Sequence, residues 1–295
     1  MPVGTKALKK RIASVKNTKK MTKAMEMVSA AKMRKSVTAT QKTRLFTTLN
    51  RELVSHLSYV EDISHPLMSE KEAGKTLLVL ITSNRGLCGS YNSNVIKDTQ
   101  AYLKSNGVTD VDVLGVGKKS AVFCKRYGYT LIGVYEEFSD KPEFDTVLML
   151  VKRVMNEFAL EKYNRVLVAY TDFRSPVLQT ATVRQLLPLT RDAFDMFGDT
   201  SDTGQSSSQM ENYIFEPSQQ EIVNEVVPRL VEVLLYQMIL ESSASEHSSR
   251  MVAMKNATDN ASDLIETMTL VYNKARQAAI TQEISEIVGG AVALE

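Results

Sequence analysis

The chain has 295 residues, of which 43% are hydrophobic, so it is long enough to bury a substantial core. No run approaches the roughly 18 consecutive apolar residues of a membrane-spanning helix, which argues against an integral membrane protein of that kind. The sequence holds only two cysteines, Cys88 and Cys124, and no spacing pattern pairs them. This usage fits a reducing compartment and argues against a disulfide scaffold.

Charge is unevenly distributed along the chain. The net charge is +2, yet residues 1–44 contain thirteen Lys and Arg against a single acid, Glu26. That segment therefore carries +12 and the remainder −10. A concentration of one sign repels itself and attracts an anionic partner. A single lysine of such a segment more often belongs to a solvated helix face, so the inference rests on the cluster as a whole.

Two long segments lack both glycine and proline, residues 5–65 and residues 229–288. Ten of the thirteen glycines lie between Gly74 and Gly204. This distribution predicts a very long helix at each end of the chain with a compact domain between them. At a rise of about 1.5 Å per residue, the second segment would reach about 90 Å, too long to be buried in one domain of this size. We therefore expect the two helices to bury each other as an antiparallel coiled coil.

Apolar positions in both segments support this pairing. In the first segment they recur at helical spacings, at Leu8, Ile12, Val15, Met21, Met25, Val28, Leu45, Leu49, Leu53, Leu57 and Val60. In the second segment, alternating steps of four and three run through His247, Met251, Met254, Thr258, Ala261, Ile265, Met268, Tyr272, Ala275 and Ala279. A heptad seam of this length predicts a left-handed coiled coil. Its small residues and methionines predict close, irregular packing.

Between the two segments, the pattern changes to short runs rich in β-branched residues. These runs predict strands at 76–82, 111–116, 129–135, 165–171 and 182–189. Amphipathic windows between several of them predict helices near 92–105, 118–127 and 144–162. Strands that alternate with helices indicate a mostly parallel sheet covered on its faces, so we expect a Rossmann-like α/β domain.

Three segments follow from these patterns: an N-terminal helix over residues 1–65, the α/β domain over 75–217 and a C-terminal helix over 218–295. The polar, Ser-rich stretch 198–212 is predicted to be a loop. Proline is tolerated in the first turn of a helix, so Pro228 is predicted to begin the long C-terminal helix. Residues 218–227 are then expected to form a separate short helix.

No active site is visible in the sequence. The loop 83–92 joins a predicted strand to a predicted helix, where phosphate often binds, but it lacks the G-x-G-x-x-G pattern and a tight turn explains it better. Cys88 has no neighbouring histidine to activate it and is interpreted as structural. The stretch 114–120 fails the phosphate-loop pattern at Asp112 and Lys119. The three histidines form no cluster with metal-ligand spacing, so we expect neither a metal nor a cofactor.

The last predicted helix changes character near its end. Over 276–291 it carries a few hydrogen-bonding side chains, Arg276, Gln277, Thr281 and Glu283, among small apolar residues. A solvated end would carry more charge and a lipid-facing end would carry none. The mixture suits a helix end enclosed by other protein subunits, with ordinary surface polarity as the simpler alternative.

Three stretches resemble the γ subunits of rotary F-type ATP synthases. They are the C-terminal stretch 241–291, the N-terminal RIASVKNTKKMTKAMEMVSAAKMRK at 11–35 and the central ITSNRGLCGSYN at 81–92. They occur in the family's order, so the resemblance covers the whole chain. Asn84 stands where the family usually has Asp. The chain lacks the long cysteine-bearing insertion of chloroplast γ subunits, and the resemblance indicates a bacterial type.

The resemblance implies a non-catalytic rotor, the central stalk that couples ion flow through a membrane ring to ATP synthesis or hydrolysis on β subunits. The implied partners are the α and β subunits of the catalytic ring, the ε subunit and the ring of membrane c subunits. The implied location is peripheral, on the cytoplasmic face of the bacterial inner membrane. Implied partner contacts fall on Met25, Arg85, Gly86, Cys88, Arg250, Arg276, Gln277, Thr281 and Glu283.

Two other classes of function compete with this hypothesis. The basic N-terminal helix could bind nucleic acid, although its apolar stripe must be buried and residues 1–44 lack aromatic platforms. The chain could also be a Rossmann-like enzyme with coiled-coil arms, in which case residues 75–217 would bind nucleotide. We expect neither.

Overall fold

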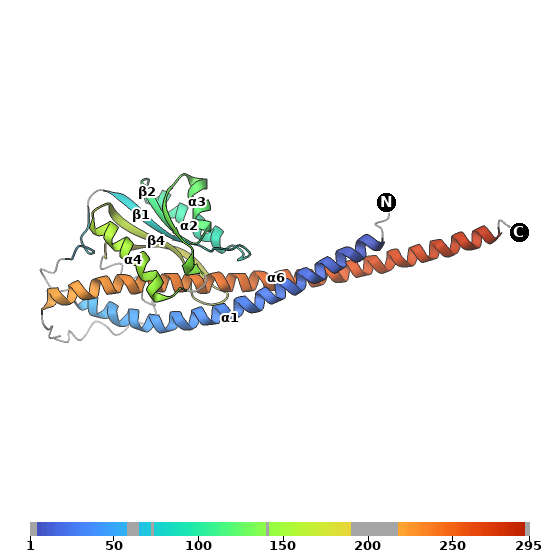
Figure 1. Cartoon of the computed structure of the whole chain (residues 1–295), viewed down its shortest axis with the longest axis horizontal. Coiled ribbons are helices and arrows are strands. Elements are labelled where there is room, and N and C mark those ends of the chain that lie inside the picture. Colours follow the sequence, from blue (N-terminus) through green and yellow to red (C-terminus); the bar gives the residue numbers. More distant parts are fainter. Residues whose placement is uncertain (1–4, 58–64, 72–73, 140–141, 190–217, 293–295) are drawn as a thin grey trace. The chain divides into compact units, whose positions relative to one another are not determined.

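The computed structural model describes the chain in two compact units, formed by residues 31–249 and by residues 1–30 together with 250–295. Within these units, the described ranges are 5–57, 65–71, 74–139, 142–189 and 218–292. Two helices contribute to both units: α1 (Thr5–Leu57) and α6 (Gln219–Val292). They are the long helices at either end of the chain in Figure 1. Each unit is described below by itself.

In the unit formed by residues 1–30 and 250–295, α1 and α6 pair as an antiparallel coiled coil. The hydroxyls of Thr22 and Thr258 lie 2.7 Å apart, and Ile265 shares a groove with Ala13, earlier on α1. A later residue on α6 therefore faces an earlier one on α1, as expected of antiparallel helices. The predicted seam is confirmed from Met251 to Ala275 and is wrong at Ala279. Its members are buried at Met254, Thr258 and Ala261 and half-buried at Met251, Ile265, Met268, Tyr272 and Ala275, whereas Ala279 is exposed.

The predicted stripe on α1 is partly wrong. Leu8, Ile12 and Val15 lie on its buried side, but Met21 and Val28 are 65% and 57% exposed. Continuing from Val15 in alternating steps of four and three, the buried side runs instead through Lys19, Thr22, Glu26 and Ser29. Met21 and Val28 each precede a seam position by one residue, which turns them about 100° away from α6. Polar residues can occupy the seam because Thr22 finds a hydroxyl partner across it.

The unit of residues 31–249 contains a five-stranded sheet with the order β3-β2-β1-β4-β5. Parallel pairing joins β1 to β2, β1 to β4 and β2 to β3, and only β5 runs antiparallel, against β4. The strands are β1 (Lys75–Ile81), β2 (Val111–Val116), β3 (Thr130–Tyr135), β4 (Tyr163–Phe173) and β5 (Gln179–Leu187). This order is that of a doubly wound α/β sheet. The predicted fold class is confirmed.

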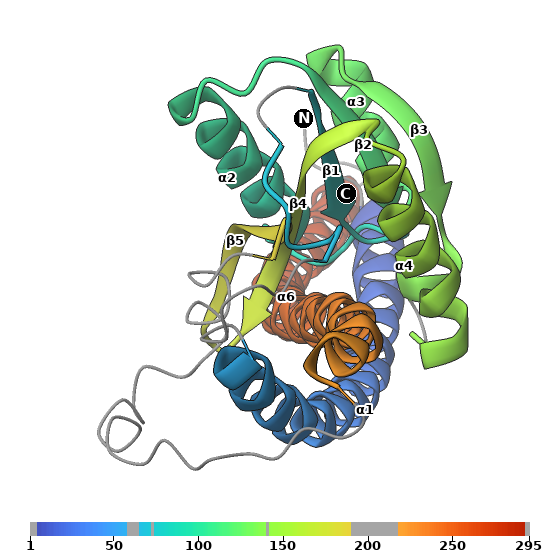
Figure 2. The ribbon, with the colours of Figure 1, turned by 90° about the vertical axis from the view of Figure 1, so that its left-hand side faces the viewer.

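Helices cover both faces of this sheet, as Figure 2 shows. One face packs against α2 (Tyr91–Ser105) and α3 (Lys119–Tyr127), with Val95, Leu103 and Phe123 in its core. The other face packs against α4 (Phe144–Ala159) and the first part of α6. A short 3-10 turn, η1 (Glu137–Ser139), follows β3. The three predicted helices between strands are therefore confirmed, with small differences at their ends.

Two predicted boundaries are wrong, both at prolines. The last strand was expected over 182–189, but β5 spans Gln179–Leu187 and stops before Pro188, which has no N–H to donate to the sheet. The long helix was expected to begin at Pro228 after a separate short helix, but α6 is continuous from Gln219 with Pro228 inside it. Buried Val223, Val227 and Val231 form one apolar side that continues across the proline. Burial of that side offsets the single helical hydrogen bond that proline removes.

Candidate functional site

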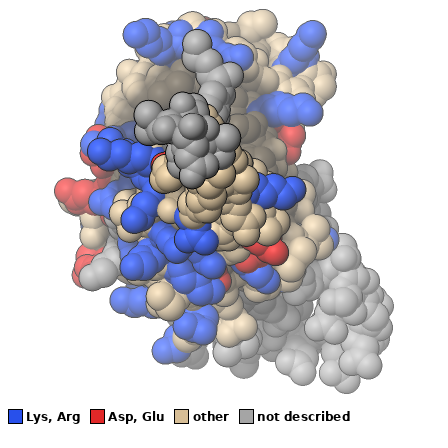
Figure 3. Space-filling view, turned by 90° about the vertical axis from the view of Figure 1, so that its right-hand side faces the viewer, with Lys and Arg blue, Asp and Glu red and all other residues tan. Residues whose placement is uncertain are grey.

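The α1 part of the coiled-coil unit is strongly basic, and the face of the molecule drawn in Figure 3 shows more blue than red side chains. Lys16, Lys19, Lys20 and Lys23 line an open groove of about 670 Å³. Its remaining lining residues are Ala13, Asn17, Ala24, Met27 and Ile265. The acid of this stretch, Glu26, lies 3.0 Å from Lys23 in the same helix and so neutralises one of its neighbours. The groove therefore suits an acidic partner that also carries apolar side chains.

Met25 and Arg250 belong to this same unit. Met25 is half-buried on α1, between exposed Lys23 and Met27. Arg250 keeps only 9% of its surface exposed, so most of its side chain is engaged within the chain. A partner that approaches α6 here would reach only the edge of this guanidinium.

The loop that follows β1 belongs to the other unit and is organised by two side chains. Asn92 accepts a hydrogen bond from the N–H of Ser83 (3.0 Å) and donates to the Ser83 hydroxyl (2.7 Å) and to the Cys88 sulfur (3.2 Å). The Ser83 hydroxyl in turn donates to the carbonyl of Arg85 at 2.7 Å. These bonds tie both ends of the loop to its centre and fix the shape of its tip.

The tip of this loop is exposed, whereas its thiol is not. Arg85, Gly86 and Leu87 are exposed, and Leu87 adopts a positive φ of 63°. Cys88 has 2% of its surface exposed, because its sulfur faces Ser83 and Asn92. The loop can therefore offer a cation and an apolar side chain to a partner. Cys88 contributes by holding the loop together, as the structural interpretation of this residue expects.

The chain's own groups bond to one another at the sheet edge where doubly wound folds bind nucleotides, at the carboxyl ends of β1, β2 and β3, and they line an open hollow of about 280 Å³ there. Asn84 accepts a hydrogen bond from the N–H of Lys118 (3.0 Å) and donates through its amide to the carbonyl of Glu136. The Lys118 amine pairs with the Glu136 carboxylate at 3.0 Å. An ionised aspartate at 84 could not donate to that carbonyl, so the amide has a structural use here. The mismatched phosphate-loop stretch 114–120 lies at this same edge.

The end of α6 is bare. Every described side chain from 276 to 290 is exposed, and these include Arg276, Gln277, Thr281 and Glu283. The same stretch exposes a set of large apolar side chains: Ile280, Ile284, Ile287 and Val288, each between 48% and 72% exposed. Helices that expose apolar and polar side chains all round are stabilised when other protein surrounds them. The four predicted contact residues are thus available to a partner, and Thr281 also donates to the carbonyl of Gln277 within the helix.

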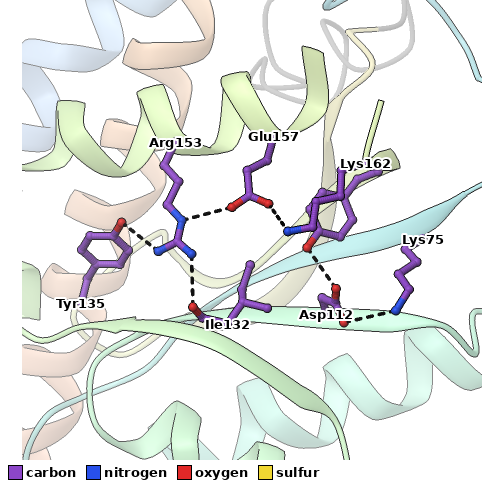
Figure 4. A network of polar contacts seen from close by, with 8 residues as sticks. Lys75, Asp112, Ile132, Tyr135, Arg153, Glu157 and Lys162 are labelled. Atoms are coloured by element: carbon purple, nitrogen blue, oxygen red, sulfur yellow. Dashed lines mark hydrogen bonds and ion pairs between the residues drawn. The ribbon is translucent and has the colours of Figure 1, made fainter. Parts of the chain in front are cut away.

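A chain of polar contacts crosses the sheet between β1, β2, β3, β4 and α4 (Figure 4). Glu157 accepts hydrogen bonds from Arg153 (3.3 Å) and Lys162 (2.7 Å), and Arg153 also donates to the carbonyl of Ile132 at 3.1 Å. At the other end, the hydroxyl of Tyr163 donates to Asp112 at 3.0 Å, and Lys75 lies 3.8 Å from the same carboxylate.

Neighbouring charges shift several pKa values in this network. Burial alone would raise the pKa of Glu157, but hydrogen bonds from Lys162 and Arg153 outweigh it and lower that pKa. Burial and the hydrogen bond to Asp112 raise the pKa of Tyr163. The hydrogen bond with Glu157 raises the pKa of Lys162. Each shift stabilises the state in which the groups already pair, so the network braces α4 against the sheet and leaves no group poised for proton transfer.

Among the residues that the structure describes, no three His, Cys, Asp or Glu side chains come together as metal ligands would. None of the described helices combines the length and the apolar character needed to cross a membrane.

One group of contacts was missed at the level of sequence. The nine residues 241–249 (ESSASEHSS) of α6 are almost entirely buried, and their serines hydrogen bond to α2 and to the hairpin of β4 and β5. The concentration of serine in a helix that must be buried was a visible signal. Heptad spacing gave it no weight, because only His247 of this stretch lies on the predicted seam.

The fold combines a two-helix coiled coil, an α/β sheet with bonds between its own groups across the carboxyl edge, and a helix end exposed on all sides. This combination defines a class: a structural, protein-binding subunit of a larger assembly. The sequence model of the family described as ATP synthase matches residues 4–294. The ATP synthase gamma chain of Cupriavidus necator is 40% identical over 295 residues, 99% of each chain. That of Vesicomyosocius okutanii subsp. Calyptogena okutanii is 38% identical over 301 residues and covers 100% of both. The chain belongs to the family of ATP synthase gamma chains.

Solved structures agree with this assignment. A chain of the Tetrahymena thermophila mitochondrial ATP synthase central stalk and c-ring is 26% identical, with a TM-score of 0.57 over 80% of this chain and 99% of its own. A chain of the Euglena gracilis mitochondrial ATP synthase has a TM-score of 0.68 over 98% and 94% of the two chains at 19% identity, and supports the fold alone. As a gamma chain, the protein is a subunit of ATP synthase, and catalysis belongs to the β subunits.

Proposed function

We propose that this chain is the rotor of a proton-translocating F-type ATP synthase and couples ion flow through a membrane ring to ATP synthesis or hydrolysis by turning inside a ring of three α and three β subunits. The observation that carries the proposal is the bare end of α6, where residues 276–290 are exposed on every side. Such a helix end is stabilised when other protein subunits surround it. The Tetrahymena relative is named as part of a central stalk with a c-ring.

Asymmetry supplies the mechanism. Three catalytic sites that are identical in sequence can differ only if a shared partner breaks their threefold symmetry. A rod of two helices, continued by one, presents a different face to each β subunit. It therefore acts as a ligand with different affinities for the open and closed states of the three sites. Rotation changes which site is favoured, and reciprocity requires that nucleotide binding push back on the rod.

The contacts proposed for this mechanism fall in three places. Met25 and Arg250 would lie near acidic levers on β, to which the lysine-lined groove of α1 adds attraction. Exposed charge pairs are weak and non-directional, so such attraction need not fix one rotational position. Arg85 and Gly86, supported by Cys88, would form a second contact at the loop tip. Arg276, Gln277, Thr281 and Glu283 would engage a loop of the α and β ring.

The remaining partners and the location complete the proposal. The α/β domain within 75–217 would bind the ε subunit and the ring of c subunits, and the helices within 1–65 and 218–295 would form the axle. The subunit would be peripheral, on the cytoplasmic face of the bacterial inner membrane. Family membership and the full-length match to bacterial gamma chains support these points.

Reconstitution tests the proposal. The chain is mixed with purified α and β subunits, and the product is examined for an assembly of three α, three β and one copy of this chain. ATPase activity that depends on the chain, and rotation of a bead attached through a Lys104→Cys variant on exposed α2, are the expected results. Failure to assemble, or assembly without rotation, would overturn the proposal. Tight DNA binding that falls steeply with salt would instead favour the nucleic-acid alternative.

A further inference from the structure

The serine-rich stretch 241–249 of α6 differs from the rest of that helix within the α/β unit. Before it, α6 packs through apolar side chains such as Val227, Leu234 and Ile239. Within it, Ser242, Ser245 and Ser248 are each completely buried although their side chains are polar. Apolar contact is non-directional, whereas a hydrogen bond fixes both distance and angle. Along α6, contact with the rest of the unit therefore changes from apolar packing, which does not fix the orientation of the helix, to hydrogen bonds, which do.

The hydroxyls of this stretch contact α2, β4 and the turn after β4, all of which are remote from it in the sequence. The Ser242 hydroxyl lies 2.7 Å from that of Tyr91 at the start of α2 and accepts a hydrogen bond from the N–H of Thr171 on β4 at 3.4 Å. The Ser245 hydroxyl donates to the carbonyl of Thr171 at 3.2 Å. Ser248 donates to the carbonyl of Pro176 at 2.7 Å.

Two more serines of this stretch contact other elements. Ser249 lies on the same face of α6 as Ser242 and Ser245, and Ser243 lies on a second face. Ser249 donates to the side-chain oxygen of Gln179, the first residue of β5. Positions 242, 245 and 249 are spaced by three and four, so they lie along one face of the helix, toward the sheet. Ser243 is turned about 100° from Ser242, and its hydroxyl lies 3.4 Å from that of Ser36 on α1. Contacts on two faces oppose turning of the helix about its own axis.

From this arrangement, we infer that residues 242–249 prevent α6 from turning about its own axis relative to the α/β domain. We call this stretch the torsional key. The inference rests on the proposed rotor function, because only a subunit that transmits torque needs such a key. Tyr91 and Ser242 are positioning residues at its centre, both almost fully buried. Short serine side chains keep α6 close to the sheet, so that the contact between them permits little rotation of the helix.

The first test measures the joint in the full chain, without partners. Spin labels are placed on exposed α2 and α6 positions through Lys104→Cys and Asn224→Cys, with the buried native cysteines left in place. The double variant Ser242→Ala, Ser245→Ala removes three of the five inter-element hydrogen bonds described for Ser242, Ser245, Ser248 and Ser249. If the five bonds resist rotation equally and in parallel, the stiffness falls to two fifths. The width of the distance distribution, which varies as the inverse square root of stiffness, should then rise about 1.6-fold.

Controls separate a loosened joint from a damaged fold. Ser262→Ala removes a hydroxyl that donates to the carbonyl of Thr258 within α6 itself, and it should leave the distribution unchanged. Tyr91→Phe keeps the ring in the core and removes only the hydroxyl, so it serves if the serine variant fails to fold. A distribution of unaltered width in folded Tyr91→Phe and in the serine variant would overturn the inference.

The second test uses the assembled synthase in lipid vesicles. The serine variant should keep its ATPase rate without an opposing gradient. Its ATP-driven proton pumping should stall at a smaller gradient than that of the wild type and of Ser262→Ala. A looser joint with unaltered pumping under load would overturn the key while leaving the rotor in place. Failure of the wild-type chain to support rotation would count against the rotor itself.

Discussion

The hydroxyl groups of Thr22 and Thr258 lie 2.7 Å apart across the seam of the coiled coil, where heptad packing ordinarily places apolar side chains. The two hydroxyls share two protons, so one donates across the seam and the accepting one donates to a carbonyl of its own helix: Thr22 to Lys19 at 3.1 Å, or Thr258 to Met254 at 2.8 Å. The seam is thus held by a polar pair that remains partly satisfied if the helices shift. Such a pair specifies which residues of α1 and α6 face each other, without the deep interdigitation of large apolar side chains.

The first prediction concerns this pair. Replacing either threonine alone by valine leaves the other hydroxyl without its partner and should lower the free energy of unfolding by about 1 kcal/mol. Replacing both should recover most of that loss, because two valines suit the seam. Urea unfolding of the wild type, both single variants and the double variant gives the coupling directly. Additive losses in the double variant would show that the two hydroxyls do not interact.

The second prediction concerns Glu157, whose pKa is lowered from its ordinary 4.5. A lowered pKa means that the folded state binds its proton less readily, so the stabilisation is present above about pH 4.5 and is lost as the pH falls through the folded value. Glu157→Gln should therefore cost about 1 kcal/mol at pH 7, and the difference from the wild type should shrink toward pH 3.

Unfolding of both proteins at several pH values measures this difference. Glu161→Gln removes a carboxylate from the exposed turn after α4, outside this network, and is the matched control. If the difference between wild type and Glu157→Gln stays constant from pH 7 to pH 3, the pairing with Arg153 and Lys162 does not stabilise the charged form.

The third prediction concerns Cys124 on α3. Burial raises the pKa of its thiol from the ordinary 9.0 to about 11. At pH 8 the reactive thiolate should be about a hundredfold scarcer than in the unfolded chain, so alkylation should slow by at least that factor. The raised pKa also implies stability that is complete below pH 9 and declines as the pH rises toward 11. A Cys88→Ser background isolates the thiol, and mass spectrometry follows its labelling. Equal rates with and without urea would contradict the burial.

Much of the fold could be predicted because local chemistry and tertiary packing agree there. The runs 76–82 and 111–116 are β-branched and apolar, and they became the buried β1 and β2. The seam from Met254 to Ala275 was predicted because a heptad pattern has one geometric solution. Prediction failed where tertiary contacts override a local rule, as at Met21, which shares helical spacing with the seam but lies one residue from it.

The candidate site shows the same division. Arg85 at the loop tip and Arg276 at the helix end are exposed, and their use as partner contacts stays a prediction. The burial of Cys88 agrees with its interpretation as a structural thiol, whereas its particular partners, Ser83 and Asn92, and the burial of Arg250 could not be predicted from the sequence. The joint at Ser242 involves Tyr91 and Thr171, and no sequence pattern relates positions so far apart.

The fourth prediction follows from Pro228, which lies inside α6 against the local rule. Pro228→Ala restores an N–H that can donate to the carbonyl four residues earlier and removes the clash of the ring. Because the flanking Val227 and Leu230 are already buried, packing should not change, and the free energy of unfolding should rise by about 1–3 kcal/mol. Thermal unfolding measures the gain. A lower midpoint would show that the proline shapes the helix in a way its neighbours require.

The last prediction concerns Arg276 and Gln277. Both are exposed near the end of α6, so Arg276→Ala with Gln277→Ala should change the free energy of unfolding of the free chain by no more than about 0.5 kcal/mol. If they hold a loop of the surrounding ring, losing them should cost on the order of 2 kcal/mol of contact energy and should lower torque or coupling. ATP synthesis and ATP-driven proton pumping by the reconstituted synthase measure the effect. Lys104→Ala removes an equally exposed cation from α2 and should change neither rate, which separates a specific contact from a general loss of charge. Unaltered synthesis and pumping in the double variant would remove both residues from the proposed contact and leave the exposed apolar side chains of 276–290 to hold the helix in its sleeve.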